Sequence, residues 1–179
     1  MAELGAVILA GGAARRLSHV DKPGLVVGGR TLLSRALDAV TDADPVVIVG
    51  PRRPLSRPVR WTREDPPGSG PLAALAAGIA ALPTDCELAA VLAADLVGVR
   101  HTTVERLCAA LGEADGAVLT DDGVRQWLIG VWRVSAVRAA LPADPADGSL
   151  RHTLGRLSIV DVAAEPGEAR DIDTPADLP

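Results

Sequence analysis

The sequence contains almost no aromatic residues. Phe and Tyr are absent, and three Trp bring the aromatic share to only 2%. Hydrophobic residues nevertheless make up 48% of the 179 residues, so the core has to be built from Ala, Val, Leu and Ile. An alanine-rich core favours helices that pack closely on a sheet. The length suits a single domain, residues 1–179, with room for a sizeable core.

Cysteine and histidine are also scarce. The two cysteines, Cys86 and Cys108, are far apart and form no CxxC motif. This argues against a disulfide framework or a structural zinc site, and we expect both to be small buried residues. The three histidines, His19, His101 and His152, lack metal-ligand spacing and are expected at the surface.

Long hydrophobic runs and an excess of positive charge are missing as well. No apolar run reaches the ~18 residues of a membrane-spanning helix. The first residues, MAELGAVILAGG, place an acid before a short apolar run, unlike a secretory signal. The net charge of −5 gives no general attraction to nucleic acid or to an anionic membrane. We therefore expect a cytoplasmic protein with no membrane and no nucleic-acid partner.

Segments with strand and helix patterns alternate along the chain. This alternation predicts an α/β fold: a three-layer, doubly wound, mostly parallel sheet of Rossmann-like type, with ligands at the carboxyl ends of the strands. The expected strands are 5–9, 45–50, 59–62, 87–94, 116–120, 127–132 and 158–163. The expected helices are 31–40 with Thr31 as cap, 72–82, 102–111 capped by Thr102 or Thr103, 134–141, 150–157 and a last one opened by 171–175.

A stretch with almost no side chains follows the first strand. Ala10, Gly11 and Gly12 leave backbone N–H groups bare, so the loop can wrap an anion or lie flat against a nucleobase. Arg16 and Lys22 follow and can neutralise phosphates. The stretch is neither a Walker loop nor a GxGxxG motif. The plainer alternative is an ordinary glycine-rich turn.

Three aspartates are candidates for metal or nucleotide binding. Asp95 follows an uncharged strand, where a carboxylate at the rim of a low-dielectric core needs a partner such as a divalent cation. Its alternative role as a helix cap is disfavoured because the next helix is expected only near residue 102. Asp173 shares one side of an extended segment with Asp171, or caps a helix. Asp65 precedes two prolines and either binds a ribose or base donor or initiates the turn.

These residues carry a resemblance to a known family. LAGG at 9–12, Arg16, DKP at 21–23 and GGRTLL at 28–33 resemble the nucleotidyltransferases that join a nucleoside monophosphate to a phosphorylated acceptor. GPLAAL at 70–75, ADL at 94–96 and DIDTP at 171–175 follow in the same order, so the resemblance covers about 5–178. Within the family the chain is most similar to the molybdenum cofactor guanylyltransferases, because LAGG is typical of guanylyl enzymes and LAAG of cytidylyl ones.

The resemblance implies an activity and roles for the residues. GMP would pass from GTP to molybdopterin with release of pyrophosphate, and cofactor-delivering proteins or molybdoenzymes are possible partners. Mg²⁺ would be held by Asp95 with Asp173, while Arg16 and Lys22 would bind the triphosphate, and Arg16, Lys22 and Asp95 form the catalytic set. Nucleotide contacts are implied for Leu9, Ala10, Gly11, Gly12, Arg16, Lys22, Asp65, Gly70 and Asp95, and 126–128 would line the acceptor side.

The chain departs from the family pattern at four places. Ser18 stands for a usual Gly, the usual Pro after Asp95 is missing, Trp127 replaces a Pro, and Asp173 stands where Asn is common. None of these removes a charged group that the chemistry needs. These departures bear on the identity of the acceptor substrate more than on the transfer of the nucleotide. The alternatives are a cytidylyltransferase for the same cofactor, a guanylyltransferase acting on a phospholactate or sugar phosphate, and a non-catalytic nucleotide-binding relative.

Overall fold

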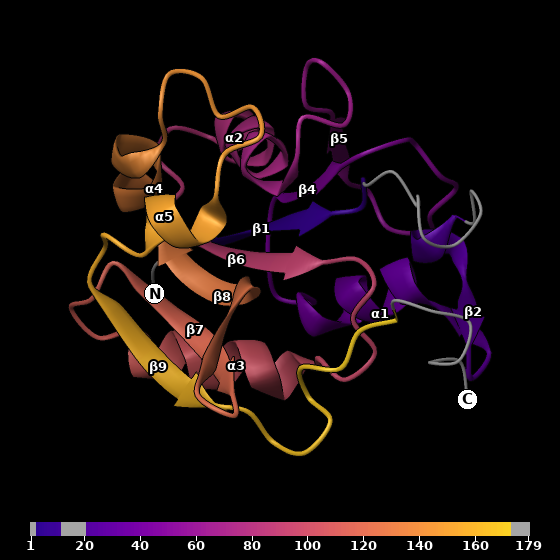
Figure 1. Cartoon of the computed structure of the whole chain (residues 1–179). Helices are drawn as coiled ribbons and strands as arrows, with labels where there is room; N and C mark the ends of the chain where they lie inside the picture. The colour runs from indigo at the N-terminus through magenta and orange to yellow at the C-terminus, as the bar shows by residue number, and fades with distance from the viewer. Residues whose placement is uncertain (1–2, 12–20, 173–179) are drawn as a thin grey trace.

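The protein is organised around one mixed sheet (Figure 1). The computed structural model describes residues 3–11 and 21–172, and the seven strands of this sheet lie in the order β5-β4-β1-β6-β8-β7-β9. Every neighbouring pair is parallel except the two pairs that β8 makes with β6 and β7. The mostly parallel sheet predicted from the sequence is therefore confirmed. The strands are β1 Leu4–Leu9, β4 Val46–Val49, β5 Arg60–Thr62, β6 Leu88–Ala93, β7 Gly116–Asp121, β8 Val124–Arg133 and β9 Ile159–Ala163.

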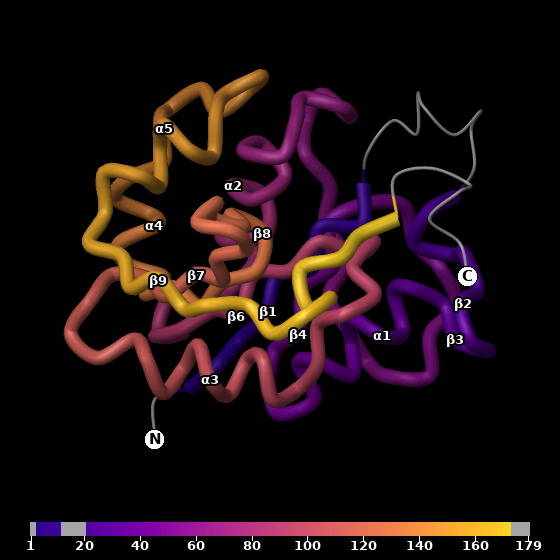
Figure 2. Tube along the Cα trace, turned by 60° about the horizontal axis from the view of Figure 1, so that its bottom comes forward, coloured from indigo at the N-terminus to yellow at the C-terminus, as the bar shows by residue number. Residues whose placement is uncertain are grey.

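Helices cover both faces of the sheet and make three layers (Figures 1 and 2). Helices α1 (Leu32–Ala39) and α3 (His101–Leu111) share a buried apolar cluster with one face. Helices α2 (Pro71–Ala81), α4 (Val134–Ala140) and α5 (Leu150–Leu154) share a second cluster with the other face. Within the described part of the chain, no helix is long and apolar enough to cross a membrane.

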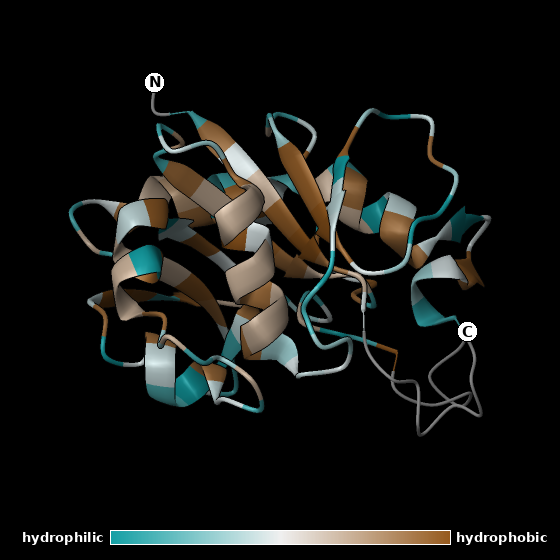
Figure 3. Cartoon of the chain, turned by 90° about the horizontal axis from the view of Figure 1, so that it is seen from above, coloured by the Kyte–Doolittle hydropathy of each residue, from teal (hydrophilic) through white to brown (hydrophobic). Residues whose placement is uncertain are grey.

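The central strands are apolar throughout because both of their faces are covered (Figure 3). In β1, Ile8 packs into the cluster of α1 and α3, while Val7 packs into the cluster of α2, α4 and α5. Small side chains build most of this core, as the composition predicts. The exception is Trp132, which is fully buried and lies so close to Gly116 that a Cβ there would be 2.3 Å from its ring.

Of the two helix N-caps predicted from the sequence, the one for α1 is confirmed and the one for α3 is wrong. Thr31 caps α1 as predicted, since its Oγ1 accepts the N–H of Ser34 at 3.1 Å. The cap predicted for α3 is wrong, because the helix already begins at His101 and contains both threonines. Thr103 instead accepts the N–H of Arg100 at 3.1 Å. The helix predicted to begin at 171–175 extends beyond the described residues.

Arginines from distant parts of the chain close the helix C-termini. Helices α1, α2 and α3 carry no basic residue in their last turns. Arg57, Arg138 and Arg133 donate to carbonyls at the ends of α1, α2 and α3, respectively. Two of these carbonyls, those of Leu37 and Ile79, also accept the N–H of their helix's C-cap residue, and the arginines add a second donor there and bind carbonyls just past the helix ends.

The remaining features of the fold are a tight turn and the two cysteines. Residues 122 and 123 make the tight turn between β7 and β8, with φ of 46° at Asp122 and 77° at Gly123. Both cysteines are free thiols, and Cys86 is buried as predicted, whereas Cys108 is only half-buried. Burial raises the pKa of each thiol above its ordinary value, which keeps them protonated and unreactive at neutral pH.

Candidate active site

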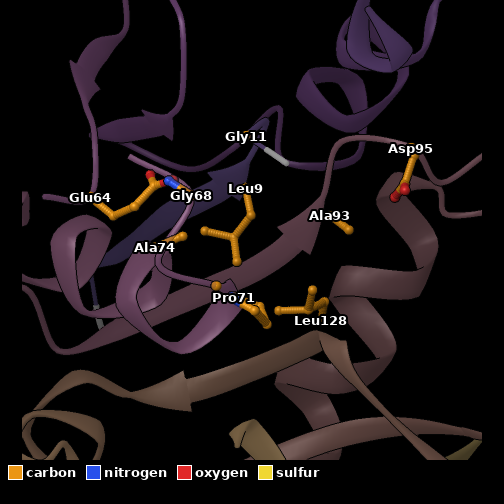
Figure 4. A pocket seen from close by; sticks show the side chains of 10 residues that line it. Leu9, Gly11, Glu64, Gly68, Pro71, Ala74, Ala93, Asp95 and Leu128 are labelled. Atoms are coloured by element: carbon orange, nitrogen blue, oxygen red, sulfur yellow. The ribbon is translucent and has the colours of Figure 1, made fainter. Parts of the chain in front are cut away.

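A cavity of about 240 Å³ opens at the carboxyl ends of β1, β5 and β6 (Figure 4). Parallel sheets place their ligands at this edge because the loops that follow the strands converge there. Sequence-predicted and unpredicted residues meet in this cavity. Its lining consists of Leu9, Gly11, Glu64, Gly68, Gly70, Pro71, Ala74, Ala93, Asp95 and Leu128.

The loop that follows β1 and begins with Ala10 and Gly11, here called the glycine loop, starts at the cavity. The carbonyl of Leu9 accepts the N–H of Ala94 at 3.0 Å, and Ala10 donates its own N–H to the carbonyl of Val49 at 2.8 Å. Ala10 is therefore still a buried part of the sheet, and its N–H is used there. Gly11 is the residue at which the chain leaves the sheet and lines the cavity.

Glu64 is a cavity residue that the sequence analysis missed. Its side chain is only 7% exposed, and its Oε1 accepts the N–H of Gly68 at 2.9 Å. Its Oε2 is buried and has no hydrogen-bond partner among the described residues. A buried acceptor without a partner is costly, so this oxygen is available to a donor on a ligand. Asp65, the residue singled out from the sequence, does not line the cavity.

The turn before α2 forms the next wall. Gly68 and Gly70 have φ values of 89° and 92°, which a residue with a side chain adopts only with strain. Gly70 precedes the first turn of α2, so the N-terminal end of that helix faces the cavity. A helix N-terminus favours negative charge, such as that of a phosphate. Asp147 supports the turn from outside by donating its N–H to the carbonyl of Ser69 at 2.8 Å.

Arg53 links the two ends of the glycine loop, and it also escaped the sequence analysis. Its Nε donates to both carboxylate oxygens of Asp21 at 3.0 and 3.2 Å, and its Nη1 lies 3.5 Å from the carbonyl of Ala10. The hydrogen bond from Arg53 lowers the pKa of the Asp21 carboxyl. Lys22, next to Asp21, begins a short 3₁₀ helix, Lys22–Gly24. Arg53 therefore sets where the Lys22 segment starts relative to β1.

A small apolar cluster joins the segments that carry the predicted charges. Val27, Leu32 and Ile172 are its buried members, and Leu25 and Val97 pack against them. In sequence, Leu25, Val27 and Leu32 follow Lys22, Val97 follows Asp95, and Ile172 directly precedes Asp173. The cluster therefore holds the three segments together at one edge of the sheet.

Asp95 lies at the rim of the cavity, across from Glu64 (Figure 4). Its main-chain carbonyl accepts the N–H of Ile172 at 3.2 Å, so the chain passes directly beside Asp95 before it continues to Asp173. Gly12, Arg16 and Asp173 lie outside the described residues, and their places in the site stay predictions. So does that of Ser18.

The carboxylate of Asp95 is of a kind that suits a Mg²⁺ ion bound together with substrate phosphates. Within residues 3–11 and 21–172, no three His, Cys, Asp or Glu side chains converge on a metal-binding group. A carboxylate at the rim of a cavity supplies the hard oxygen donors that Mg²⁺ prefers. Mg²⁺ commonly uses one or two carboxylates together with substrate phosphates, and Asp95 with the predicted Asp173 would match that habit.

The predicted acceptor side contributes one residue to the cavity. Leu128 of β8 lines it, whereas Trp127 packs against the apolar cluster of α2, α4 and α5. The guanidinium of Arg125 lies 5.7 Å from the centre of the Trp127 ring. Trp127, which stands where the family has Pro, is thus a packing residue in this fold.

The fold is that of an α/β protein with a cavity at the carboxyl edge of a mostly parallel sheet, the edge where such sheets bind ligands. Residues 6–161 match the model of the MobA-like NTP transferase domain, and the chain belongs to this nucleotidyltransferase family. The molybdenum cofactor guanylyltransferase of Acidiphilium cryptum (strain JF-5) is 34% identical over 145 residues. That match covers 76% of this chain and 70% of the relative. The family resemblance inferred from the motifs is confirmed.

Solved structures show the same fold at lower identity. Molybdopterin-guanine dinucleotide biosynthesis protein A from Archaeoglobus fulgidus has a TM-score of 0.71 at 20% identity, over 97% of this chain and 94% of the other. The 2-C-methyl-D-erythritol 4-phosphate cytidylyltransferase from Thermus thermophilus has a TM-score of 0.73 at 22% identity, over 98% and 95%. Since a cytidylyltransferase shares the fold, the fold alone does not choose the base.

Proposed function

We propose that this nucleotidyltransferase transfers GMP from GTP to molybdopterin, forming the guanine dinucleotide cofactor and releasing pyrophosphate. The observation that carries the proposal is the cavity in which Gly11, Glu64 and Asp95 meet. A small main-chain loop, a buried acceptor and a carboxylate at the rim are the groups needed to hold a base and a metal-bound phosphate chain. The guanylyltransferase of A. cryptum supports the choice of base and acceptor.

Glu64 supports guanine as the base. The Watson–Crick edge of guanine presents two neighbouring N–H donors, whereas cytosine presents one amino group next to an acceptor nitrogen. A carboxylate offers about four acceptor positions, and Gly68 occupies one of those of Glu64. The unpartnered Oε2 and the remaining acceptor position of Oε1 would together accept both guanine donors, whereas cytosine would turn its acceptor nitrogen toward one of these oxygens.

Gly11 leaves room for the base beside Glu64. A Cβ at Gly11 would lie 3.7 Å from the Val49 carbonyl and 3.8 Å from Glu64 Oε1, which is ordinary contact. The fold itself would thus accept a methyl group there. The glycine is therefore better explained by the close approach of a ligand than by the packing of the protein.

The transfer itself is a displacement that the protein catalyses by positioning. A phosphate oxygen of molybdopterin attacks the α-phosphorus of GTP in line. A new P–O bond forms to that phosphorus, its bond to the bridging oxygen of the β-phosphate breaks, and pyrophosphate leaves. Arg16 and Lys22 would hold the triphosphate, with the N-terminus of α2 nearby. Mg²⁺, held by Asp95 with Asp173, would neutralise charge on the α-phosphate.

Pyrophosphate release tests the proposal. The full chain is incubated with ATP, CTP, GTP or UTP, with and without molybdopterin. We expect release only with GTP and molybdopterin together. Release with CTP would contradict the base, and release with a sugar phosphate or phospholactate in place of molybdopterin would contradict the acceptor. GTP binding without any release would favour a non-catalytic relative.

Lys22 offers an independent readout because it is the only lysine in the chain. An amine-directed reagent therefore reports on one side chain, with the N-terminal amine as an internal control. GTP with Mg²⁺ should slow the labelling of Lys22 and leave the N-terminal amine unaffected. Equal labelling with and without GTP would exclude Lys22 from the triphosphate site.

A further inference from the structure

The segment after β9 runs from one edge of the sheet, past α3, to the loop that begins at Asp95 (Figures 1 and 2). There it pairs with the loop that follows β6. Val97 donates its N–H to the carbonyl of Arg170 at 2.9 Å, and Leu96 and Asp171 form an antiparallel bridge. With the bond from Ile172 to Asp95, the main chain around Asp95 is paired on this side.

Glu168 anchors this segment to α3. Its side chain is only 4% exposed, and it accepts hydrogen bonds from the Thr103 hydroxyl, from Arg106 at 2.9 and 3.0 Å and from the N–H of Glu165 at 2.7 Å. Burial by itself would raise the pKa of the Glu168 carboxyl, but these donors outweigh it and lower the pKa. The buried group is thus a carboxylate fully engaged by the protein.

The turn that contains Gly167 and Glu168 packs directly against the loop that follows Asp95. A Cβ at Gly98 would be 1.9 Å from the carbonyl oxygen of Gly167 and 2.7 Å from that of Glu168. Only a glycine allows this approach, so a side chain at position 98 would push the two segments apart. The loop also lacks the family's proline after Asp95, and its own sequence therefore does little to stiffen it.

We propose that Glu168 is a positioning residue for the metal site. Through Thr103 and Arg106 it pins residues 165–172 to α3, which holds the Asp95 main chain in place and brings the chain to Asp173. The proposal rests on the proposed function only in taking a divalent cation as the ligand of Asp95. Groups that orient metal ligands commonly change metal affinity by about 10–100-fold when removed.

The test compares Glu168→Ala and Glu168→Gln with a matched control. Asp161→Asn breaks the ion pair between Arg125 of β8 and Asp161 of β9, neither of which lines the cavity. Mn²⁺ affinity is measured by electron paramagnetic resonance in the presence of GTP. Amide hydrogen exchange at Val97 and Ile172 is measured on the free full-length protein.

We expect Glu168→Ala to weaken Mn²⁺ binding by about 10-fold and to speed exchange at both amides. Glu168→Gln keeps an acceptor for Thr103 and should recover part of both effects, while Asp161→Asn should leave both unchanged. Faster exchange with unchanged Mn²⁺ affinity would overturn the proposal, because Glu168 would then be purely structural. So would unchanged exchange.

Two further variants keep the outcome clear. If Glu168→Ala fails to fold, Arg106→Gln removes the charged partner and leaves the carboxylate with Thr103, and the same two losses are expected. Asp95→Asn reports on the metal site itself. If it binds Mn²⁺ as tightly as the natural chain, the metal role of Asp95 in the proposed function fails, and the role of Glu168 fails with it. If it loses Mn²⁺ and Glu168→Ala does not, only the positioning proposal fails.

Discussion

The two sides of the cavity are built in different ways. The side proposed to bind the base, here called the base side, consists of Gly11, Glu64 and Gly70. Gly11 follows β1, Glu64 follows β5 and Gly70 precedes α2. The sheet hydrogen bonds and one short-range bond, from Gly68 to Glu64, place these residues. The side around Asp95, proposed to bind the metal and here called the metal side, depends on contacts between segments far apart in sequence. One example is the hydrogen bond from Thr103 to Glu168, which are 65 residues apart. The base side is therefore placed by the sheet and a short local turn, whereas the metal side is held by main-chain bonds, an apolar cluster and side-chain bonds between distant segments.

The largest effect is expected on the metal side. Asp95→Asn removes the charge of the carboxylate proposed to bind Mg²⁺ and should lower Mg²⁺-dependent turnover about a thousand-fold, because metal stabilisation of a transferring phosphoryl group is worth several kcal/mol. Pyrophosphate release over a range of Mg²⁺ concentrations measures this. A circular dichroism melt should show the fold retained. Turnover close to that of the natural chain would exclude Asp95 from the reaction.

On the base side, Glu64→Gln should alter which nucleotide is used. It replaces the acceptor Oε2 with an amide and should reduce the preference for GTP over CTP by about 10–100-fold, as expected for a lost hydrogen bond to a charged group. The ratio of kcat/KM for the two nucleotides measures the effect. Asp65→Asn, one residue further along, is the comparison. If it has the larger effect, the sequence-based choice of Asp65 is right and Glu64 is not the base contact.

The contact between the two ends of the glycine loop, at Ala10 and Asp21, can be removed at Arg53. Arg53→Ala removes the hydrogen bonds to Asp21 and should raise the KM for GTP about 10-fold with a smaller change in kcat. The reason is that Asp21, the residue before Lys22, is then no longer held in position. Steady-state kinetics separate the two constants. Arg52→Ala is the matched control, because Arg52 is exposed and next in sequence. Equal effects of the two variants would indicate a general loss of positive charge.

The smallest expected effect concerns pH and stability. Because the pKa of Glu168 is lowered in the fold, its contribution is present above the ordinary carboxyl range and is lost as the pH falls through the folded pKa. Glu168→Gln should therefore cost about 1–2 kcal/mol at neutral pH, and the cost should shrink as the pH falls below the ordinary carboxyl range. Urea unfolding across that range measures the difference. A constant difference would show that the charge of Glu168 does not stabilise the fold.

The sequence predicted the secondary structure well because its apolar runs are short and separated by clear turn residues. All seven predicted strands are present, with ends that differ by at most a few residues. Prediction was weaker where two neighbouring residues have the same chemistry. Thr102 and Thr103 at α3, and Glu64 and Asp65 at the cavity, are such pairs. Only the packing of the surrounding elements decides which member of each pair takes the structural or cavity-lining place.

By itself, the sequence determined the α/β class and the nucleotidyltransferase family. Alternating apolar and helical segments, and motifs such as LAGG and DKP, are local and can be read in order. Only the tertiary structure decided that Glu64 lines the cavity, that Arg53 joins Ala10 to Asp21 and that Glu168 anchors the segment beside Asp95. The reason is physical: these contacts join residues that are distant in the chain, and their geometry arises only when the sheet, the helices and the loops are packed together.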